Sequence, residues 1–188
     1  MTEATLVRLL VFRVGSLVCA AEVDQVREIL PRLPTTRIPG APPVVAGLVN
    51  VRGRLVTVVE GWRALGQAAP ARPAPADPAH PEEDATGPSG STVILGLGGR
   101  PRTEEARLDT GEGDGVHLVG FTVDDVMDML AVSPATLEDR STGGLAGVDP
   151  RLVRAVGRRQ GPDGSGAVVL VLNMDALLGP ILYEGREQ

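Results

Sequence analysis

The acidic residues Asp124, Asp125 and Asp128 are the first candidates for chemistry, because neighbouring carboxylates can hold a divalent cation. With such a cation they would support a metal-dependent hydrolase. The chain has only two histidines, however, and no evident fourth ligand accompanies the three acids. Such a cluster is more commonly a solvated surface. The single cysteine, Cys19, lies in an apolar segment that is typical of a protein core. We therefore predict no catalytic residue, no metal site and no cofactor.

A second candidate is Arg52, in the sequence Asn50-Val51-Arg52-Gly53 between two Val-rich segments. Glycine at 53 suits a turn with positive φ, so we expect a hairpin that directs the Arg52 guanidinium outward. An arginine held on a hairpin is a good interface anchor because its planar head forms forked hydrogen bonds at modest entropic cost. The alternative is an ordinary solvent-exposed turn arginine.

The composition is that of a globular protein, with 188 residues, 43% hydrophobic and 22% charged. All 18 basic residues are arginine, and the net charge is −6. Residues 67–91 carry −3 and residues 100–115 carry −2, which leaves −1 for the remainder. We expect no basic face from this charge distribution. The distribution therefore argues against nucleic acid and anionic membrane surfaces as partners.

The cysteine count and the apolar runs bear on the compartment. One cysteine excludes an internal disulfide and favours a reducing environment. Arg8 and Arg13 interrupt the first apolar stretch, and no run approaches the roughly 18 apolar residues that a membrane-spanning helix needs. We therefore expect a cytoplasmic protein without direct membrane insertion.

Two segments lack apolar periodicity. Residues 67–91, rich in Pro, Ala and acid, are predicted to be a disordered insertion, and residues 100–115 a flexible acidic loop. Asn173 is a candidate cap for a short C-terminal helix that Gly179-Pro180 would end, and Asp124–Leu130 fits either a helix or a strand. The remaining short apolar runs predict strands at Leu6–Val14, Leu17–Ala21, Val45–Val51, Leu55–Val59, Thr92–Leu97, His117–Val123, Leu152–Val156 and Ala167–Leu172.

The sequence also contains an internal repeat. Val23–Ile29 recurs as Val123–Met129, and Val58–Gly66 recurs more loosely as Val171–Gly179, in the same order. Each copy follows a strand-like run. We infer a duplicated, mainly β unit that forms two similar small barrels.

Residues 47–53, Gly-Leu-Val-Asn-Val-Arg-Gly, resemble the G-(I/V/L)-x-N-(L/V)-R-G core of the CheW family of bacterial chemosensory adaptors. Val26–Ile29, Val123–Val126 and Val171–Leu178 match further motifs of that family in order, so the resemblance spans residues 5–180. It implies two similar five-stranded SH3-like barrels. The subdomains would lie roughly at residues 15–99 and 116–172, and strands could be exchanged between them.

The resemblance implies a non-catalytic adaptor that couples the cytoplasmic tips of chemoreceptors to the regulatory domain of a CheA-type histidine kinase. That regulatory domain has the same double-barrel fold in the family, and the adaptor is associated with membrane receptor arrays. The alternatives are a CheW-like scaffold of a non-flagellar or other signalling pathway, and the hydrolase described above. The residues that the resemblance places at the partner-binding surface are Val26, Glu28, Ile29, Asn50, Val51, Arg52 and Gly53.

Overall fold

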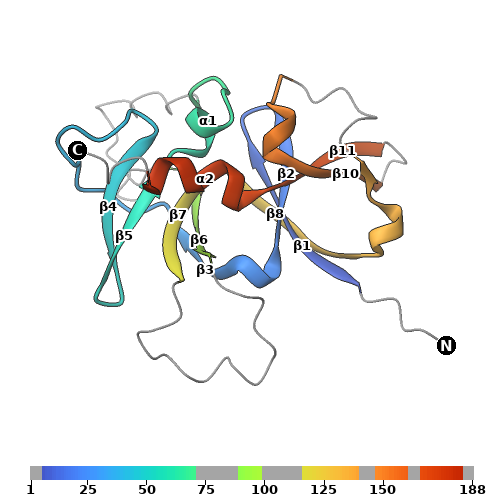
Figure 1. Ribbon diagram of the computed structural model, residues 1–188, viewed down its shortest axis with the longest axis horizontal. Helices are drawn as coiled ribbons and strands as arrows, with labels where there is room; N and C mark the ends of the chain where they lie inside the picture. Colours follow the sequence, from blue (N-terminus) through green and yellow to red (C-terminus); the bar gives the residue numbers. More distant parts are fainter. Residues whose placement is uncertain (1–5, 71–88, 99–115, 140–146, 161–165, 184–188) are drawn as a thin grey trace, which may run out of the picture.

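The computed structural model describes residues 6–70, 89–98, 116–139, 147–160 and 166–183. Its strands form two sheets that lie side by side (Figure 1). The predicted acidic loop at 100–115 and all but the ends of the predicted insertion at 67–91 fall outside the described residues.

One sheet, called the first barrel, has the strand order β3-β6-β7-β5-β4, and the other, called the second barrel, has the order β8-β1-β2-β11-β10-β9. The first barrel consists of β3 (Val26–Pro31), β6 (Ser91–Leu97), β7 (His117–Val123), β5 (Arg54–Val59) and β4 (Val45–Val51). The second consists of β8 (Asp125–Val132), β1 (Val7–Val14), β2 (Leu17–Glu22), β11 (Gly166–Leu172), β10 (Val153–Gln160) and the two-residue β9 (Glu138–Asp139). The helical elements are α1 (Gly61–Ala64), α2 (Met174–Tyr183) and the 3-10 turns η1 (Val23–Gln25), η3 (Pro134–Thr136) and η4 (Pro150–Leu152).

The two barrels repeat the same topology. If β1, β2, β3, β4 and β5 are matched in chain order with β6, β7, β8, β10 and β11, the two sheet orders become identical apart from β9. Each sheet also contains one parallel pair, β2 with β11 and β5 with β7. The predicted mainly β class with two similar five-stranded barrels is confirmed.

The repeats exchange their first two strands. The hairpin β1–β2 from the start of the chain lies in the second barrel, and the hairpin β6–β7 from the middle lies in the first (Figure 1). The chain crosses between the barrels through η1 after β2, and through Asp124 alone between β7 and β8. The expected subdomains at 15–99 and 116–172 therefore each contribute strands to both sheets.

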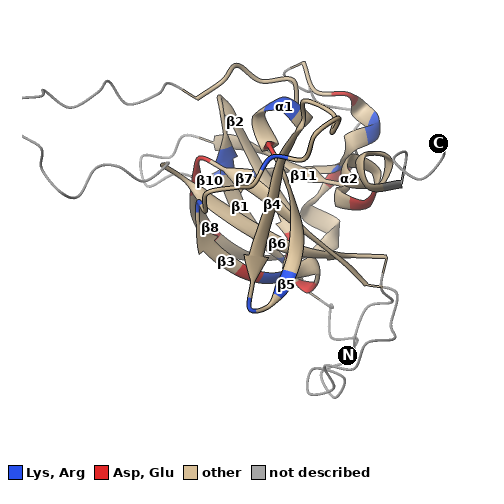
Figure 2. Cartoon of the chain, turned by 90° about the vertical axis from the view of Figure 1, so that its left-hand side faces the viewer, with Lys and Arg blue, Asp and Glu red and all other residues tan. Residues whose placement is uncertain are grey.

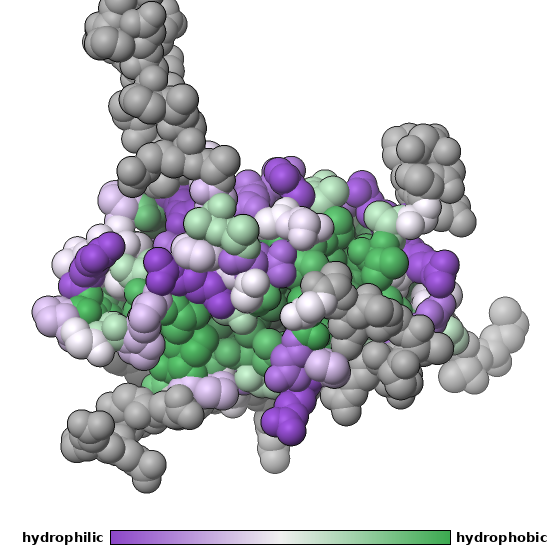
Figure 3. Space-filling view, turned by 90° about the horizontal axis from the view of Figure 1, so that it is seen from above, coloured by the Kyte–Doolittle hydropathy of each residue, from purple (hydrophilic) through white to green (hydrophobic). Residues whose placement is uncertain are grey.

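The largest hydrophobic cluster lies between the barrels and draws on both of them. At its centre the rings of Phe12 and Phe121 meet edge to face, with their centroids 6.1 Å apart. Smaller clusters fill the interior of each barrel, around Val11 in the second and Val56 in the first. Hydrophobic side chains also gather in patches between polar ones on the surface seen from above (Figure 3). None of the helices in the described ranges is long and apolar enough to cross a membrane.

The C-terminal helix begins as predicted but ends later. The side chain of Asn173 accepts a hydrogen bond from the Ala176 amide at 3.1 Å, which caps the first turn. The helix then continues through Gly179-Pro180 to Tyr183, so the predicted end was wrong. The proline removes one helical hydrogen bond, but the residues beyond it, Ile181 and Leu182, pack against the central cluster and keep the last turn in place.

The ambiguous segment Asp124–Leu130 forms strand β8, and Val26–Pro31, which was not predicted as a strand, forms β3. Both strands occupy sheet edges, and their side chains alternate between exposed and half-buried. This alternation lacks the continuous apolar run by which the interior strands are recognised.

The two ends of the insertion, at Gln67 and Gly90, both lie near the hydrogen bond between Gly15 and Asp124. The Gly15 amide donates to Asp124 Oδ2 at 2.6 Å, and Ser16 Oγ lies 3.1 Å from Gln67 Oε1. A Cβ placed on Gly90 would lie 3.5 Å from the Asp124 carbonyl oxygen. Gln67 and Gly90 therefore leave the fold close together, and few residues are needed to join them.

Replacing residues 71–88 with a six-residue Gly/Ser linker should preserve the fold. Closing a loop costs only about 0.6 kcal/mol per doubling of its length, so we expect the free energy of unfolding to rise by about 1 kcal/mol or less. Thermal unfolding followed by circular dichroism tests this expectation. A large fall in the midpoint, or a loss of cooperativity, would show instead that the removed residues pack on the barrels.

Candidate functional site

The turn between β4 and β5 has an unusual backbone. Arg52 has φ of 52° and Gly53 has φ of 84°, and Arg52 is the only described residue other than glycine with positive φ. Two residues with positive φ between paired Val51 and Arg54 form a tight hairpin of the I′ type, which prefers Asn or Gly at its first central position. The Gly53 amide donates to Asn50 Oδ1 at 2.8 Å and fixes the turn. The left-handed conformation of Arg52 is strained, and Asn would adopt the same conformation at a lower cost in free energy.

The Arg52 side chain leads from this turn to Glu28 on β3. Its Nη2 donates to Glu28 Oε1 at 2.7 Å, and the two side chains are 81% and 26% exposed. The hydrogen bond and charge of Glu28 raise the pKa of the Arg52 guanidinium. An ion pair this exposed adds little stability, so its main effect is to fix where the guanidinium lies.

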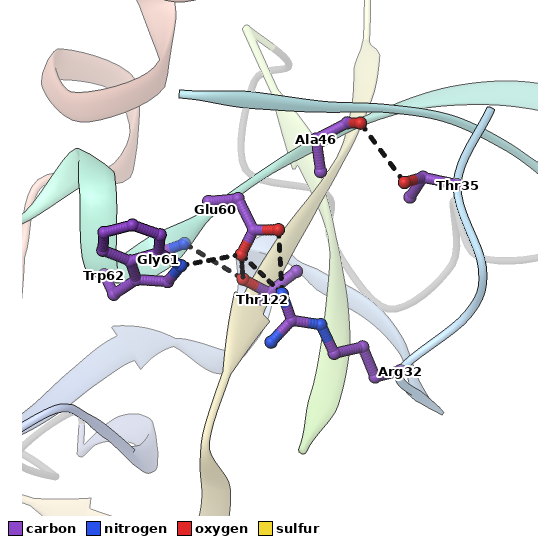
Figure 4. Close-up of polar contacts among 7 residues, drawn as sticks. All are labelled: Arg32, Thr35, Ala46, Glu60, Gly61, Trp62 and Thr122. Carbon is purple, nitrogen blue, oxygen red and sulfur yellow. Dashed lines mark hydrogen bonds and ion pairs between the residues drawn. The ribbon is translucent and has the colours of Figure 1, made fainter. Parts of the chain in front are cut away.

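The Arg52–Glu28 pair also spans the seam of the first barrel. Strands β3 and β4 are the two edges of the sheet, and they are not hydrogen-bonded neighbours. The ion pair joins them at the hairpin end. Beyond β3 the chain returns to β4, where Thr36 and Leu48 form an isolated antiparallel bridge and Thr35 Oγ1 donates to the Ala46 carbonyl at 3.2 Å (Figure 4). The ion pair thus crosses the seam near the hairpin, and the chain that follows β3 pairs with the middle of β4.

A partly buried polar cluster anchors the far end of β5. Glu60, which follows the strand, accepts two hydrogen bonds from Arg32 at 2.8 and 2.6 Å, one from the Trp62 indole at 3.1 Å and one from Thr122 at 3.2 Å (Figure 4). The Arg32 and Glu60 side chains are 18% and 17% exposed, so this bidentate pair is largely shielded from water. The hairpin therefore projects from a fixed base.

The structure brings some of the predicted residues together and separates others. Glu28, Asn50, Arg52 and Gly53 meet at the hairpin tip. Ile29 follows Glu28 on β3, and its side chain is 42% exposed. By contrast, Val26 packs against the central cluster and Val51 against the interior of the first barrel, so both contribute mainly to cores.

The acidic residues proposed for the hydrolase alternative have other partners. Asp124 accepts from the Gly15 amide at 2.6 Å, and Asp128 Oδ2 lies 3.3 Å from the Arg159 guanidinium. Among the described residues, no group of three or more His, Cys, Asp and Glu side chains could hold a metal ion. Burial raises the pKa of the Cys19 thiol to about 12, so this thiol stays neutral near neutral pH, as suits a core residue.

The second barrel contains a counterpart of the Arg52–Glu28 pair. Asp128 occupies on β8 the position that Glu28 has in the internal repeat, and its partner Arg159 lies on β10, the strand matched with β4. Aligning the two repeats relates Glu28 to Asp128, but their partners Arg52 and Arg159 do not lie at matching positions of a repeated motif.

Sequence reasoning also missed Leu55, which is 72% exposed next to Arg54 on the hairpin. An apolar residue at a strand start gives no signal that it faces solvent.

Comparisons with known proteins agree with the sequence resemblance. A family model described as the CheW-like domain matches residues 8–180. Among solved structures, the scaffolding protein TtCheW from Thermoanaerobacter tengcongensis is similar to this chain with a TM-score of 0.65 and 14% identity, over 92% of this chain and 88% of that chain. None of the curated proteins compared with the chain matches it. The family resemblance stated from the sequence is confirmed, and the solved structure shows the same fold.

Replacing Arg52 with Asn should leave the protein at least as stable as wild type. Asn tolerates the left-handed region that the first turn position requires, and the ion pair that is lost is exposed. We expect the thermal midpoint of Arg52→Asn to equal or exceed that of wild type, with Glu28→Gln as the matched variant that removes the pair but keeps the strained turn. A marked fall in the midpoint of Arg52→Asn would mean that the ion pair holds the hairpin in place.

Proposed function

The chain belongs to the CheW-like domain family, and we propose that it couples chemoreceptors to a CheA-type histidine kinase within a chemosensory array. Members of this family are non-catalytic scaffolds of chemotaxis signalling, and this chain is such a scaffold rather than an enzyme. The coupling of those two particular partners and the location at membrane receptor arrays are our proposal.

The observation that carries the proposal is the strained arginine at the β4–β5 turn. Positive φ at a residue other than glycine or asparagine costs free energy, and such strain concentrates at functional positions. Here the strained residue presents a guanidinium that is 81% exposed and held by Glu28. Arginine is enriched among residues that dominate binding energy at protein interfaces. A partner surface that binds a fixed cation would explain why arginine occupies this strained position.

The shape of this end of the molecule favours a folded partner. The Arg52 hairpin stands on a closed barrel whose base is fixed by the Arg32–Glu60 cluster. A rigid barrel end suits docking against another rigid domain, because little conformational entropy is lost on binding. We therefore assign this end to the regulatory domain of the kinase, whose barrels have the same fold in this family. The receptor tip, a helical hairpin, would bind elsewhere on the chain.

Reversing the charge of Arg52 should weaken kinase binding without unfolding the protein. We expect Arg52→Glu to lower affinity for the kinase regulatory domain roughly 30-fold or more, mainly through faster dissociation. The change in thermal midpoint should be small, because the side chain is exposed. Surface plasmon resonance with the full chain and the regulatory domain from the same organism measures the affinity.

Arg154→Glu is the matched control for this experiment. Arg154 is 62% exposed and pairs with Glu22, which is 27% exposed, so the charge reversal breaks a similar ion pair on the second barrel. We expect this control to bind as wild type does. If Arg52→Glu folds normally and binds the regulatory domain with wild-type affinity, the assignment of the hairpin end is wrong.

A further inference from the structure

Positive charge is concentrated in the part of the chain that builds most of the first barrel. Residues 26–60 contain five arginines and two acidic residues, a net charge of +3 in a protein whose total is −6. Figure 2 shows basic residues at the tip of the β4–β5 hairpin and on neighbouring strands of that barrel. The charge is therefore locally opposite in sign to that of the whole protein.

Strand registers place three of these arginines at one end of the first barrel. Arg52 and Arg54 lie at the hairpin tip, where β5 begins. Strand β5 runs parallel to β7, with Thr57 beside Val119, so the start of β7 lies at the same end. Strand β6 runs toward that end, because its last residue, Leu97, lies beside His117, and Val26 at the start of β3 pairs with Leu95. Arg27 therefore lies at the hairpin end as well.

Two of these three arginines have no acidic partner in the described part of the chain. Arg52 pairs with Glu28, whereas neither Arg27 nor Arg54 forms an ion pair with a described residue. The Arg27 side chain lies across Gly96, where a Cβ would approach its Nε to 2.7 Å. Glycine at 96 thus makes room for the Arg27 guanidinium at this end.

An exposed apolar side chain accompanies these cations. Leu55 follows Arg54, pairs with Asn50 across the hairpin and is 72% exposed, the highest value among the large hydrophobic residues described. An apolar contact beside a cation excludes water when a partner docks, which strengthens the electrostatic attraction. An exposed leucine thus lies beside arginines that form no ion pair within the described residues, and arginine is enriched at protein interfaces.

The second barrel shows that this charge pattern is not a requirement of the fold. There Arg159 lies 3.3 Å from Asp128, and Arg158 lies 3.6 Å from Glu138. The arginines of β10 are thus paired within the molecule, whereas Arg54 on the matching hairpin of the first barrel is not. The described arginines of the two hairpins thus differ in their pairing.

We propose that the partner surface that docks on the β4–β5 hairpin is acidic around an apolar contact, and that Arg27, Arg54 and Leu55 select it. This inference rests on the proposed function and names the chemistry of the kinase surface that this end recognises. Arg54 and Arg27 would each meet a carboxylate of the partner, while Leu55 would fill an apolar site next to Arg54. Arg52, already paired with Glu28, provides a third cation, at the hairpin tip.

The test is the affinity of the full chain for the kinase regulatory domain as a function of salt concentration. We expect Arg54→Glu to lower affinity roughly tenfold at low salt, mainly by slowing association, and the difference from wild type to shrink as salt rises. Arg54→Gln should give a smaller loss in the same direction. Arg151→Glu is the charge-matched control, since Arg151 is exposed on η4 and has no ion pair with a described residue.

Leu55→Ser tests the apolar part of the surface. We expect it to lower affinity roughly tenfold at every salt concentration, because lost apolar burial is not screened. Val168→Ser is its control, since Val168 is 49% exposed on β11, the strand matched with β5. Both variants retain the interior residues of their strands, and a thermal midpoint close to that of wild type is expected for each.

The outcomes separate this inference from the proposed function. If wild type does not bind the regulatory domain at all, the proposed function fails. If wild type binds, and Arg54→Glu and Leu55→Ser bind equally well, the function stands and the inference is overturned. A fall in thermal midpoint for Arg54→Glu with unchanged affinity would assign the cation to a contact within the chain and would also overturn the inference.

Discussion

The reciprocal exchange of two hairpins is the constraint on which the rest of the structure depends. Each barrel takes two strands from the other repeat, so neither repeat completes a sheet alone. The largest hydrophobic cluster lies between the barrels, with Phe12 of one repeat against Phe121 of the other. Burial of this shared cluster is the main source of stability, because apolar area removed from water dominates folding. The two barrels therefore form one cooperative unit, and the hairpin of the first barrel projects from a rigid body.

That rigidity gives the Arg52 turn its significance. The turn adopts a conformation that arginine disfavours, and its side chain reaches Glu28 across the seam of the barrel. At the other end of β5 the shielded Arg32–Glu60 pair fixes the strand. A cation that is exposed, placed on a strained turn and paired with Glu28 is preorganised for a partner, which lowers the entropic cost of binding. The scaffold role of the family and the geometry of this end thus support each other.

Much of the fold could be predicted from the sequence because its interior strands are continuous apolar runs. The repeat of Val23–Ile29 in Val123–Met129 indicated the duplication, and Gly53 indicated the hairpin. The edge strands β3 and β8 were harder to predict, since their side chains alternate in exposure. The C-terminal helix passes Pro180 because tertiary packing beyond the proline outweighs a local signal.

The exchange of hairpins and the grouping of side chains at the site depend on pairings between distant residues. Glu28 meets Arg52 only because the barrel closes between its edge strands. Charges summed by segment predicted no basic face, yet folding gathers Arg27, Arg52 and Arg54 at one barrel end, where only Arg52 pairs with an acidic residue among those described. Periodicity and composition contain no information on such contacts. The site could therefore be predicted by residue type, but not as an assembled surface.

The central claim is that the hairpin end of the first barrel contacts the kinase regulatory domain. Amide chemical-shift mapping of the isotopically labelled full chain, titrated with the unlabelled regulatory domain, tests it most directly. The account predicts that the amides of residues 27–29 and 50–55 shift or broaden most, with the Gly53 resonance among the first to change. A footprint confined to β10 and β11, with Gly53 unperturbed at saturation, would contradict it.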